Sequence, residues 1–201
     1  EGYSAADPGN DRASLCDEAI RLARLLLRMY PAEPEIMGLL ALMLLQHARI
    51  DARFGAAGEA ILLEDQDRMK WKRPPIQEGL ALLDKAMRAR RPGPYQIQAA
   101  IAGLHARAAT PEETDWSEID ALYAALERHA PSPVVTLNRA VAVAKLHGAE
   151  AALHLLAPLD KQLSAYFYFH GARGAFLLQL GRKAEAREAF NQAIALANTP
   201  A

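Results

Sequence analysis

Apolar side chains recur along the chain at intervals of three and four residues, the spacing that places them on one face of an α-helix. Glycine and proline cluster between these segments and interrupt each of them after roughly one helix length. Runs of alternating β-branched residues, which would indicate strands, are nearly absent. The pattern therefore predicts an all-α fold of antiparallel helix pairs joined by short turns.

In the first half of the chain the pattern predicts helices near residues 11–29, 34–53 and 74–90. The apolar residues that share one face of the first helix are Leu15, Ala19, Leu22, Leu26 and Met29. The run 36–45 is apolar on most sides, so the second helix is expected at the centre of this half. Residues 54–64 contain two glycines and a short apolar run, and they predict a small hairpin or an ordered loop.

The second half of the chain is more regular and contains an internal repeat. Its predicted helices span residues 95–108, 115–129, 133–147, 149–159, 165–180 and 183–197. Arg139 aligns with Arg173, 34 residues later, and this period is typical of the tetratricopeptide repeat, whose helix pairs stack into a right-handed superhelix. The residues that fit the repeat best are Gly174, Gly181, Ala186, Phe190 and Ala193, and Pro200 falls near its terminal proline.

These patterns suggest a domain organisation. Residues 1–93 are expected to form an N-terminal helical subdomain, and residues 94–201 a set of tetratricopeptide-like repeats, the two being packed as one continuous unit. The helix pair predicted over residues 95–129 fits the repeat only loosely. Small residues in the last pair are expected to let its helices approach closely.

Composition narrows the class of protein. Of the 201 residues, 51% are hydrophobic, and 23 basic residues balance 24 acidic ones to a net charge of −1. This balance argues against disorder and against an extensive nucleic-acid-binding surface. The single cysteine, Cys16, favours a reducing, cytoplasmic location. No membrane segment or signal peptide is expected, and because the chain begins at Glu1 it is expected to be a fragment or a processed product.

Few residue patterns point to catalysis or to a cofactor. The six histidines form no dense ligand set, and no nucleophile–base pair, phosphate loop or dinucleotide motif is present. We therefore expect no enzyme activity, no metal and no cofactor. The densest acidic group, Glu64, Asp65 and Asp67, lacks the ligands and the glycine of a calcium loop. A structural interpretation is that Asp65 or Asp67 caps a short helix.

That short helix would carry Arg68 and Trp71, with the Gln66 and Arg68 side chains satisfying local backbone groups or carboxylates. A basic patch follows, made of Arg68, Lys70, Lys72 and Arg73. This patch is either a contact for nucleic acid or an acidic protein face, or a solvated surface with local salt bridges.

Two aromatic segments are further candidates for binding. Residues 166–169 are four consecutive aromatics, so at least one of them is expected to leave the core. They indicate either a seam between repeats or a binding groove. Tyr95, which is followed by Gln96 and Gln98 at a helix start, is similarly open to either interpretation.

Several stretches together resemble one protein family. They are Glu1-Gly2-Tyr3, Leu15-Cys16-x-Glu18-Ala19-Ile20-Arg21-Leu22, Glu33-Pro34-Glu35-x-x-Gly38, Leu63-x-Asp65-Gln66-Asp67-Arg68-x-x-Trp71, Tyr95-Gln96-Ile97-Gln98-Ala99-Ala100-Ile101-Ala102, Thr114-Asp115-Trp116 and Ser132-Pro133-Val134-Val135-x-Leu137-Asn138-Arg139-Ala140. The chain resembles the C-terminal, tetratricopeptide-containing extension of a bacterial group of extracytoplasmic-function RNA polymerase sigma factors. The resemblance covers nearly the whole chain.

The resemblance implies a regulatory, protein-interaction domain that follows two promoter-binding domains absent from this chain. Its implied partners are those domains, core RNA polymerase and, through the missing domains, promoter DNA; self-association is left open. The candidate interaction residues are Asp65, Gln66, Asp67, Arg68, Lys70, Trp71, Lys72, Arg73, Tyr95, Gln98, Asn138, Arg139, Tyr166 and Tyr168. The alternative hypothesis is a tetratricopeptide-like scaffold that senses a peptide or a small ligand.

Overall fold

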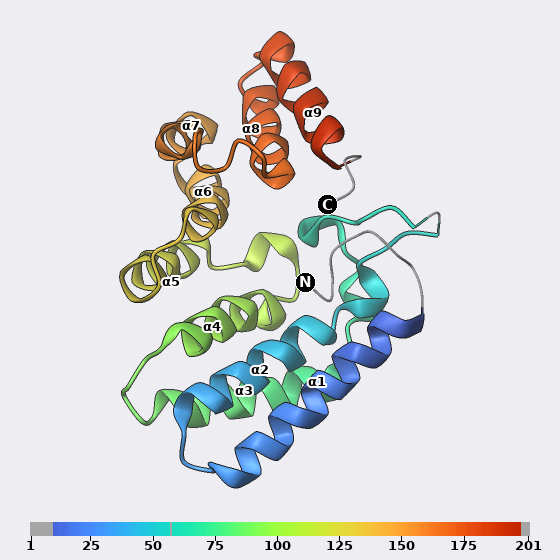
Figure 1. Ribbon diagram of the computed structural model, residues 1–201, viewed down its shortest axis with the longest axis vertical. Coiled ribbons are helices and arrows are strands. Elements are labelled where there is room, and N and C mark those ends of the chain that lie inside the picture. Colours follow the sequence, from blue (N-terminus) through green and yellow to red (C-terminus); the bar gives the residue numbers. More distant parts are fainter. Residues whose placement is uncertain (1–9, 57, 198–201) are drawn as a thin grey trace. The chain divides into compact units, whose positions relative to one another are not determined.

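The computed structural model describes residues 10–56 and 58–197, and these residues are predominantly helical (Figure 1). No strand occurs among them, and their extended pairing is limited to an isolated bridge between Phe54 and Ala60. The all-α prediction is therefore confirmed. The chain divides into two compact units, Glu1–Asp115 and Trp116–Ala201, each described by itself below. The Glu1-Gly2-Tyr3 motif and Pro200 lie outside the described residues.

The first unit is organised around a central apolar helix. Its helices are α1 (Asn10–Met29), α2 (Pro34–His47), α3 (Arg73–Met87) and α4 (Pro94–Arg107), with short 3-10 turns η1 (Ile50–Ala52), η2 (Leu63–Asp65), η3 (Arg68–Lys70) and η4 (Pro111–Glu113). As predicted, α2 is the central element, because it packs against α1, α3 and α4. Half of its residues are buried: Pro34, Met37, Gly38, Leu40, Ala41, Leu44 and Leu45.

The helix α2 ends at His47 rather than at residue 53 as predicted. The Ala48 N–H still bonds to the Leu44 carbonyl, but the Ala48 carbonyl accepts a hydrogen bond from the distant Lys72 N–H at 2.9 Å. The Ala52 N–H, which would bond to the Ala48 carbonyl in a continued α-helix, bonds to the Arg49 carbonyl at 3.0 Å. The chain turns into η1 instead, which starts the connection to α3.

The predicted boundary after residue 93 falls inside the first unit, because α4 packs against α2 and α3. The contact between α2 and α4 is very close: a Cβ atom added to Gly38 would lie 2.7 Å from the Gln96 backbone nitrogen. The Glu35 carboxylate accepts hydrogen bonds from the N–H groups of Tyr95 and Gln96, both at 3.0 Å. These N–H groups lie in the first turn of α4 and have no partner within the helix. The start of α4 is therefore fixed on α2 within the first unit.

The second unit consists of helices that pack on their neighbours in the sequence. They are α5 (Trp116–His129), α6 (Pro133–His147), α7 (Ala149–Leu156) with η5 (Ala157–Leu159), α8 (Phe167–Gln179) and α9 (Lys183–Ala197). The predicted spans 133–147 and 183–197 agree with α6 and α9. Gly148, with φ 88°, ends α6 and begins α7, a backbone conformation that favours glycine.

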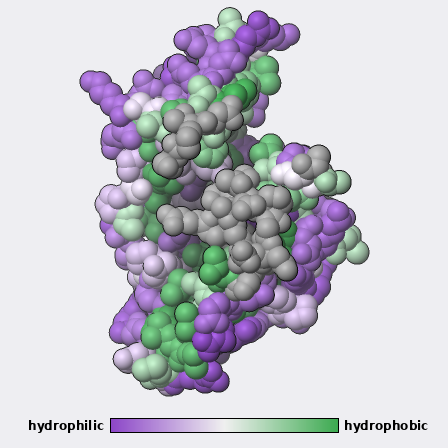
Figure 2. Space-filling view, turned by 45° about the vertical axis from the view of Figure 1, so that its right-hand side comes forward, coloured by the Kyte–Doolittle hydropathy of each residue, from purple (hydrophilic) through white to green (hydrophobic). Residues whose placement is uncertain are grey.

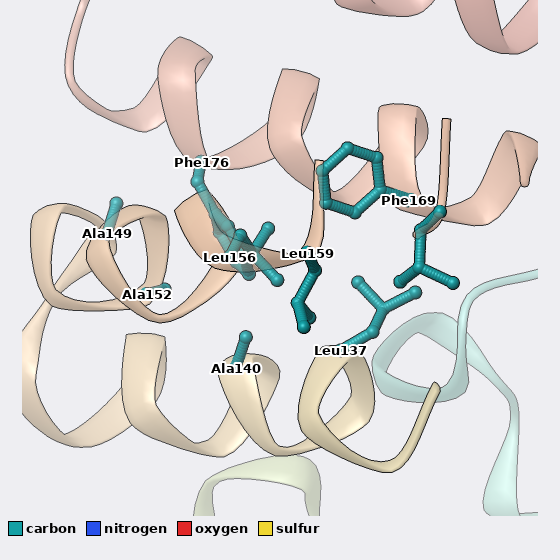
Figure 3. Packing of buried hydrophobic residues seen from close by; sticks show 9 residues of the cluster. Leu137, Ala140, Ala149, Ala152, Leu156, Leu159, Phe169 and Phe176 are labelled. Atoms are coloured by element: carbon teal, nitrogen blue, oxygen red, sulfur yellow. The ribbon is translucent and has the colours of Figure 1, made fainter. Parts of the chain in front are cut away.

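The core of the second unit forms where α6, α7 and α8 meet. Figure 3 shows Leu137 of α6, Leu156 of α7 and Phe169 of α8 directed into one shared interior. The next pair is held by a close approach, since a Cβ atom on Gly174 would lie 2.7 Å from the Phe190 ring. The expectation that small residues bring α8 and α9 together is confirmed.

The contact at Gly38 gives a test of the packing of α2 against α4. We expect Gly38→Ala to lower the free energy of unfolding, because the added methyl group meets backbone atoms of Gln96 and overpacking typically costs about 1–3 kcal/mol. Gly171→Ala is the matched control, since a Cβ there meets nothing within 4 Å and alanine favours a helix by up to about 1 kcal/mol. Urea unfolding of both variants should separate them by about 2 kcal/mol; equal stabilities would contradict the close contact.

Candidate interaction site around Trp71

The segment between α2 and α3 is an ordered loop with a hairpin-like start, as predicted for residues 54–64. The Gly55 N–H bonds to the Glu59 carbonyl at 2.9 Å, and the Ile61 N–H bonds to the Arg53 carbonyl at 2.8 Å. The Gln66 side chain is buried beneath this turn and donates from Nε2 to the Ile61 carbonyl at 3.2 Å. These hydrogen bonds hold in place the backbone that leads into the Asp65–Trp71 motif.

The Asp65–Trp71 motif is anchored by its own side chains. Asp67 Oδ1 accepts a hydrogen bond from the Met69 N–H at 2.9 Å and so caps η3. Arg68 Nη1 donates to the carbonyls of His105 and Ala108, at 2.5 and 2.6 Å. These carbonyls end α4, where the helix dipole favours a positive charge. Of the two predicted caps, Asp65 or Asp67, the structure shows Asp67, and Gln66 satisfies a local backbone group as predicted. Arg68 was expected to satisfy local groups and instead bonds to backbone carbonyls 37 and 40 residues away.

Trp71 is the apolar anchor of the loop. Its side chain is only 4% exposed and packs in a cluster with Leu45, Ala48, Ala52 and Ile76, from the end of α2, from η1 and from the start of α3. The Arg68 guanidinium lies 4.8 Å from the centre of the indole ring, and that of Arg49 lies 5.7 Å away. Both distances fall within the range of cation–π attraction.

The electrostatics around Trp71 keep one histidine neutral. Burial, together with the smaller effects of the nearby charges of Arg49 and Arg68, lowers the pKa of His105 to about 4. Burial also lowers the pKa of Arg68, while Glu112 and Glu113 act in the opposite direction. Two buried polar atoms, Trp71 Nε1 and Gln66 Oε1, have no hydrogen-bond partner among the described residues.

The structure divides the predicted basic patch in two. Arg68 is directed inward to α4, whereas the side chains of Lys70, Lys72 and Arg73 are exposed. Lys72 Nζ lies 3.3 Å from a carboxylate oxygen of Asp51. Asp65 is also exposed. The exposed surface of this loop therefore carries three basic residues, together with the Met69 side chain, which is 85% exposed.

The remaining candidates of the first unit lie at the other end of α4. Tyr95 is exposed in the first turn of that helix, and Gln98 Nε2 donates to the Pro94 carbonyl at 3.2 Å. Arg68 bonds to the opposite end of α4, so the structure does not bring Tyr95 or Gln98 together with Trp71. Gln96 was not among the predicted site residues, although its side chain is central to the contact between α2 and α4. It is fully buried and donates from Nε2 to Glu35 and to the Arg91 carbonyl.

In the second unit, Arg139 joins α5 to α6. Its Nε lies 2.8 Å from Asp120 Oδ1, and its Nη1 lies 2.8 Å from Glu127 Oε2. The Thr136 hydroxyl donates to the same Glu127 carboxylate at 2.7 Å. The hydrogen bond to Asp120 raises the pKa of Arg139. Arg139 thus holds two helices together, and of the predicted pair Asn138 and Arg139 only Asn138 is exposed.

The aromatic run at the start of α8 divides between core and surface. Phe169 is buried in the core, whereas Tyr168 is 46% exposed. The rings of Tyr166 and Tyr168 lie 5.4 Å apart, and those of Phe167 and Tyr168 lie 3.9 Å apart. Burial raises the pKa of Tyr166. The exposed part is a small aromatic cluster, and the buried part belongs to the packing of α6, α7 and α8.

A cavity of about 270 Å³ lies beside α7 and α8, and sequence analysis gave no sign of it. Its apolar lining includes Leu153, Phe169 and Leu177. Arg173 and Asp160, which also line it, form an ion pair at 3.1 Å. Its lining thus combines apolar side chains with an ion pair, groups that can contact a small amphipathic ligand or a peptide side chain.

Comparison with known proteins gives relatives without an assigned activity. The model of a family of unknown function (DUF6596) matches residues 1–87. An uncharacterized protein of Rhizobium meliloti is 69% identical over 198 residues, which is 98% of this chain and 47% of the relative. The chain thus spans about half the length of the curated relative that it matches. No solved structure matches the chain.

Among residues 10–56 and 58–197, no helix combines the length and apolar character that crossing a bilayer requires. The same residues hold no cluster of three or more histidine, cysteine, aspartate or glutamate side chains placed to bind a metal ion.

The role of Arg68 as an anchor can be tested by substitution. We expect Arg68→Ala to lower the free energy of unfolding by about 2–3 kcal/mol, because two carbonyls at the end of α4 lose a charged donor and Trp71 loses a cation on its ring. Arg73→Ala, in the same segment but exposed, should change the stability by less than about 0.5 kcal/mol. Urea denaturation of the two variants measures the difference, and equal effects would contradict the anchoring role.

The neutral state of His105 predicts a pH-dependent stability. The pKa of His105 is about 4 in the folded protein and about 6.5 when unfolded, so the unfolded chain takes up the proton first as the pH falls. Stability is therefore fully present above about pH 6.5 and is lost toward pH 4, with a loss of about 2 kcal/mol between pH 7 and pH 5. His105→Gln should abolish this part of the pH dependence, whereas the exposed control His154→Gln should keep it. An unchanged slope in His105→Gln would refute the assignment.

Proposed function

We propose that this chain is the C-terminal regulatory domain of an extracytoplasmic-function RNA polymerase sigma factor and that it acts by binding protein. The observation that carries the proposal is the match to a relative about twice as long, of which this chain spans 47%. That length leaves room for the two promoter-binding domains that the sequence resemblance implies. The partners would be those domains of the same protein and core RNA polymerase, in the cytoplasm.

The architecture of the second unit supports a binding role. Its helices pack in sequence-neighbouring pairs, and the 34-residue repeat aligns α6 and α7 with α8 and α9. We infer from this period that the pairs belong to a right-handed, tetratricopeptide-like superhelix. Stacked pairs of this kind present extended surfaces that bind peptides or partner helices.

The motif around Trp71 supports the same role through a rigid loop. Its anchoring side chains, Asp67, Arg68 and Trp71, are engaged within the first unit. The side chains exposed to a partner would be Lys70, Lys72 and Arg73, together with Met69, which directly precedes Lys70. A surface held in one conformation loses little entropy on binding, which favours affinity. An acidic face on a partner protein fits this surface, as does promoter DNA.

Transcription in vitro tests the proposed function. The full-length protein is compared with a version that ends just before Glu1, on a cognate promoter and with core polymerase. We expect the two proteins to differ in transcription by at least about tenfold, the change that corresponds to 1.4 kcal/mol of coupling. Lower transcription by the truncated protein would mean that this domain is required for activity. Higher transcription by the truncated protein would mean that the domain is a built-in inhibitor.

Equal transcription from the two proteins would contradict the proposal. It would favour the second candidate, a scaffold that senses a peptide or a small ligand. The cavity beside α7 and α8 supports that candidate, because its lining combines apolar side chains with the ion pair of Arg173 and Asp160.

A further inference from the structure

The outer face of α1 carries an exposed apolar stripe. Its members and their exposed fractions are Leu15 (66%), Leu22 (51%), Leu26 (37%) and Met29 (69%). Because 3.6 residues make one turn, positions separated by 7, 4 and 3 residues lie on one side of a helix. At a rise of 1.5 Å per residue the stripe is roughly 21 Å long.

The stripe is distinct from the face that α1 uses for packing. Ile20 and Ala23 are each 5% exposed and pack with Leu40 and Leu44 of α2. The helix α1 thus has two apolar faces, and only one of them has a partner in the described residues. Figure 2, which brings the right-hand side of Figure 1 forward, shows hydrophobic surface among hydrophilic surface over its lower part, where the first unit lies.

The spacing of residues in the stripe indicates that its partner is a helix. Intervals of seven, four and three residues are those of a seam between two packed helices. All four members of the stripe are apolar, and Arg21 and Glu18 of the same helix neutralise each other in an ion pair at 2.7 Å. Recognition by this surface therefore depends mainly on apolar contact, and an amphipathic helix fits it.

The size of the stripe favours an attached partner over a second copy of the chain. A stable interface between separate proteins typically buries about 800 Å² on each side, and four side chains on one helix supply only part of that area. A covalently linked partner acts at an effective concentration of about 1 mM or more, so a smaller surface is sufficient. The relative has more than half of its length outside the region that this chain matches.

We propose that the stripe of Leu15, Leu22, Leu26 and Met29 is the docking surface for an amphipathic helix of the promoter-binding domains in the same full-length protein. This inference rests on the proposed function and assigns the surface through which it acts. Docking on α1 ties the position of the promoter-binding domains to the first unit.

Site-specific crosslinking in the full-length protein tests the docking surface. A photoreactive amino acid is placed at Leu22 or, as a control, at Leu178 of α8; each of these leucines is 51% exposed. We expect position 22 to crosslink within one polypeptide to the promoter-binding half, at a yield at least about tenfold above position 178, the ratio for 1.4 kcal/mol of docking. Peptide mapping identifies the crosslinked segment, which should be helical and amphipathic.

Substitution gives a second readout. With the photoreactive group at Leu15, the double variant Leu22→Glu, Leu26→Glu should reduce the crosslink at least about tenfold, the loss for 1.4 kcal/mol of docking. The control Leu178→Glu should leave it unchanged. The substituted leucines are exposed, so urea unfolding of the variants should match the parent and exclude misfolding. A crosslink between two copies, equal yields at positions 22 and 178, or no effect of the double variant would each overturn the docking proposal.

The crosslinking test of the docking surface and the transcription test of the proposed function can fail independently of each other. If removing the domain changes transcription but position 22 gives no intramolecular crosslink, the docking surface is wrong and the regulatory role stands. If the crosslink forms but removal leaves transcription unchanged, the surface stands as a contact and the regulatory role fails.

Discussion

The absence of a side chain at Gly38 allows α2 and α4 to come into contact, and the rest of the first unit depends on that contact. Gln96 occupies the space, with its backbone nitrogen 2.7 Å from where a Cβ atom would lie. Glu35 lies one helical turn before Gly38 on α2, and its carboxylate accepts hydrogen bonds from the N–H groups of Tyr95 and Gln96. These N–H groups have no partner within α4 because they lie in its first turn. One end of α4 is thereby fixed on the central helix.

The other end of α4 is fixed by the Trp71 loop. Arg68 binds the last carbonyls of α4, and the Lys72 N–H binds the Ala48 carbonyl just beyond α2. Trp71 fills the space between these elements. The Asp65–Trp71 motif therefore acts mainly inside the unit, through Asp67, Arg68 and Trp71. Lys70, Lys72 and Arg73 remain exposed on its surface.

The sequence allowed the local structure to be predicted better than the long-range contacts. Pro133 and Gly148 bound α6, and Gly181 precedes α9. These local signals allowed the two helices to be placed correctly. The cap formed by Asp67 was predicted because it joins residues two apart. The partner of Arg68 lies on α4, 37 residues away at His105, and no local signal reveals it. Likewise Arg139, a predicted interaction residue, is engaged by Asp120 and Glu127, whose proximity results only from the packing of α5 against α6.

The central proposal is that this domain acts on the protein to which it is attached. Hydrogen–deuterium exchange on the full-length protein, with and without residues 1–201, tests this claim most directly, because exchange reports contacts along the whole backbone. The account predicts that a segment of the other half becomes protected when residues 1–201 are present. Identical exchange of that half in both proteins would contradict it.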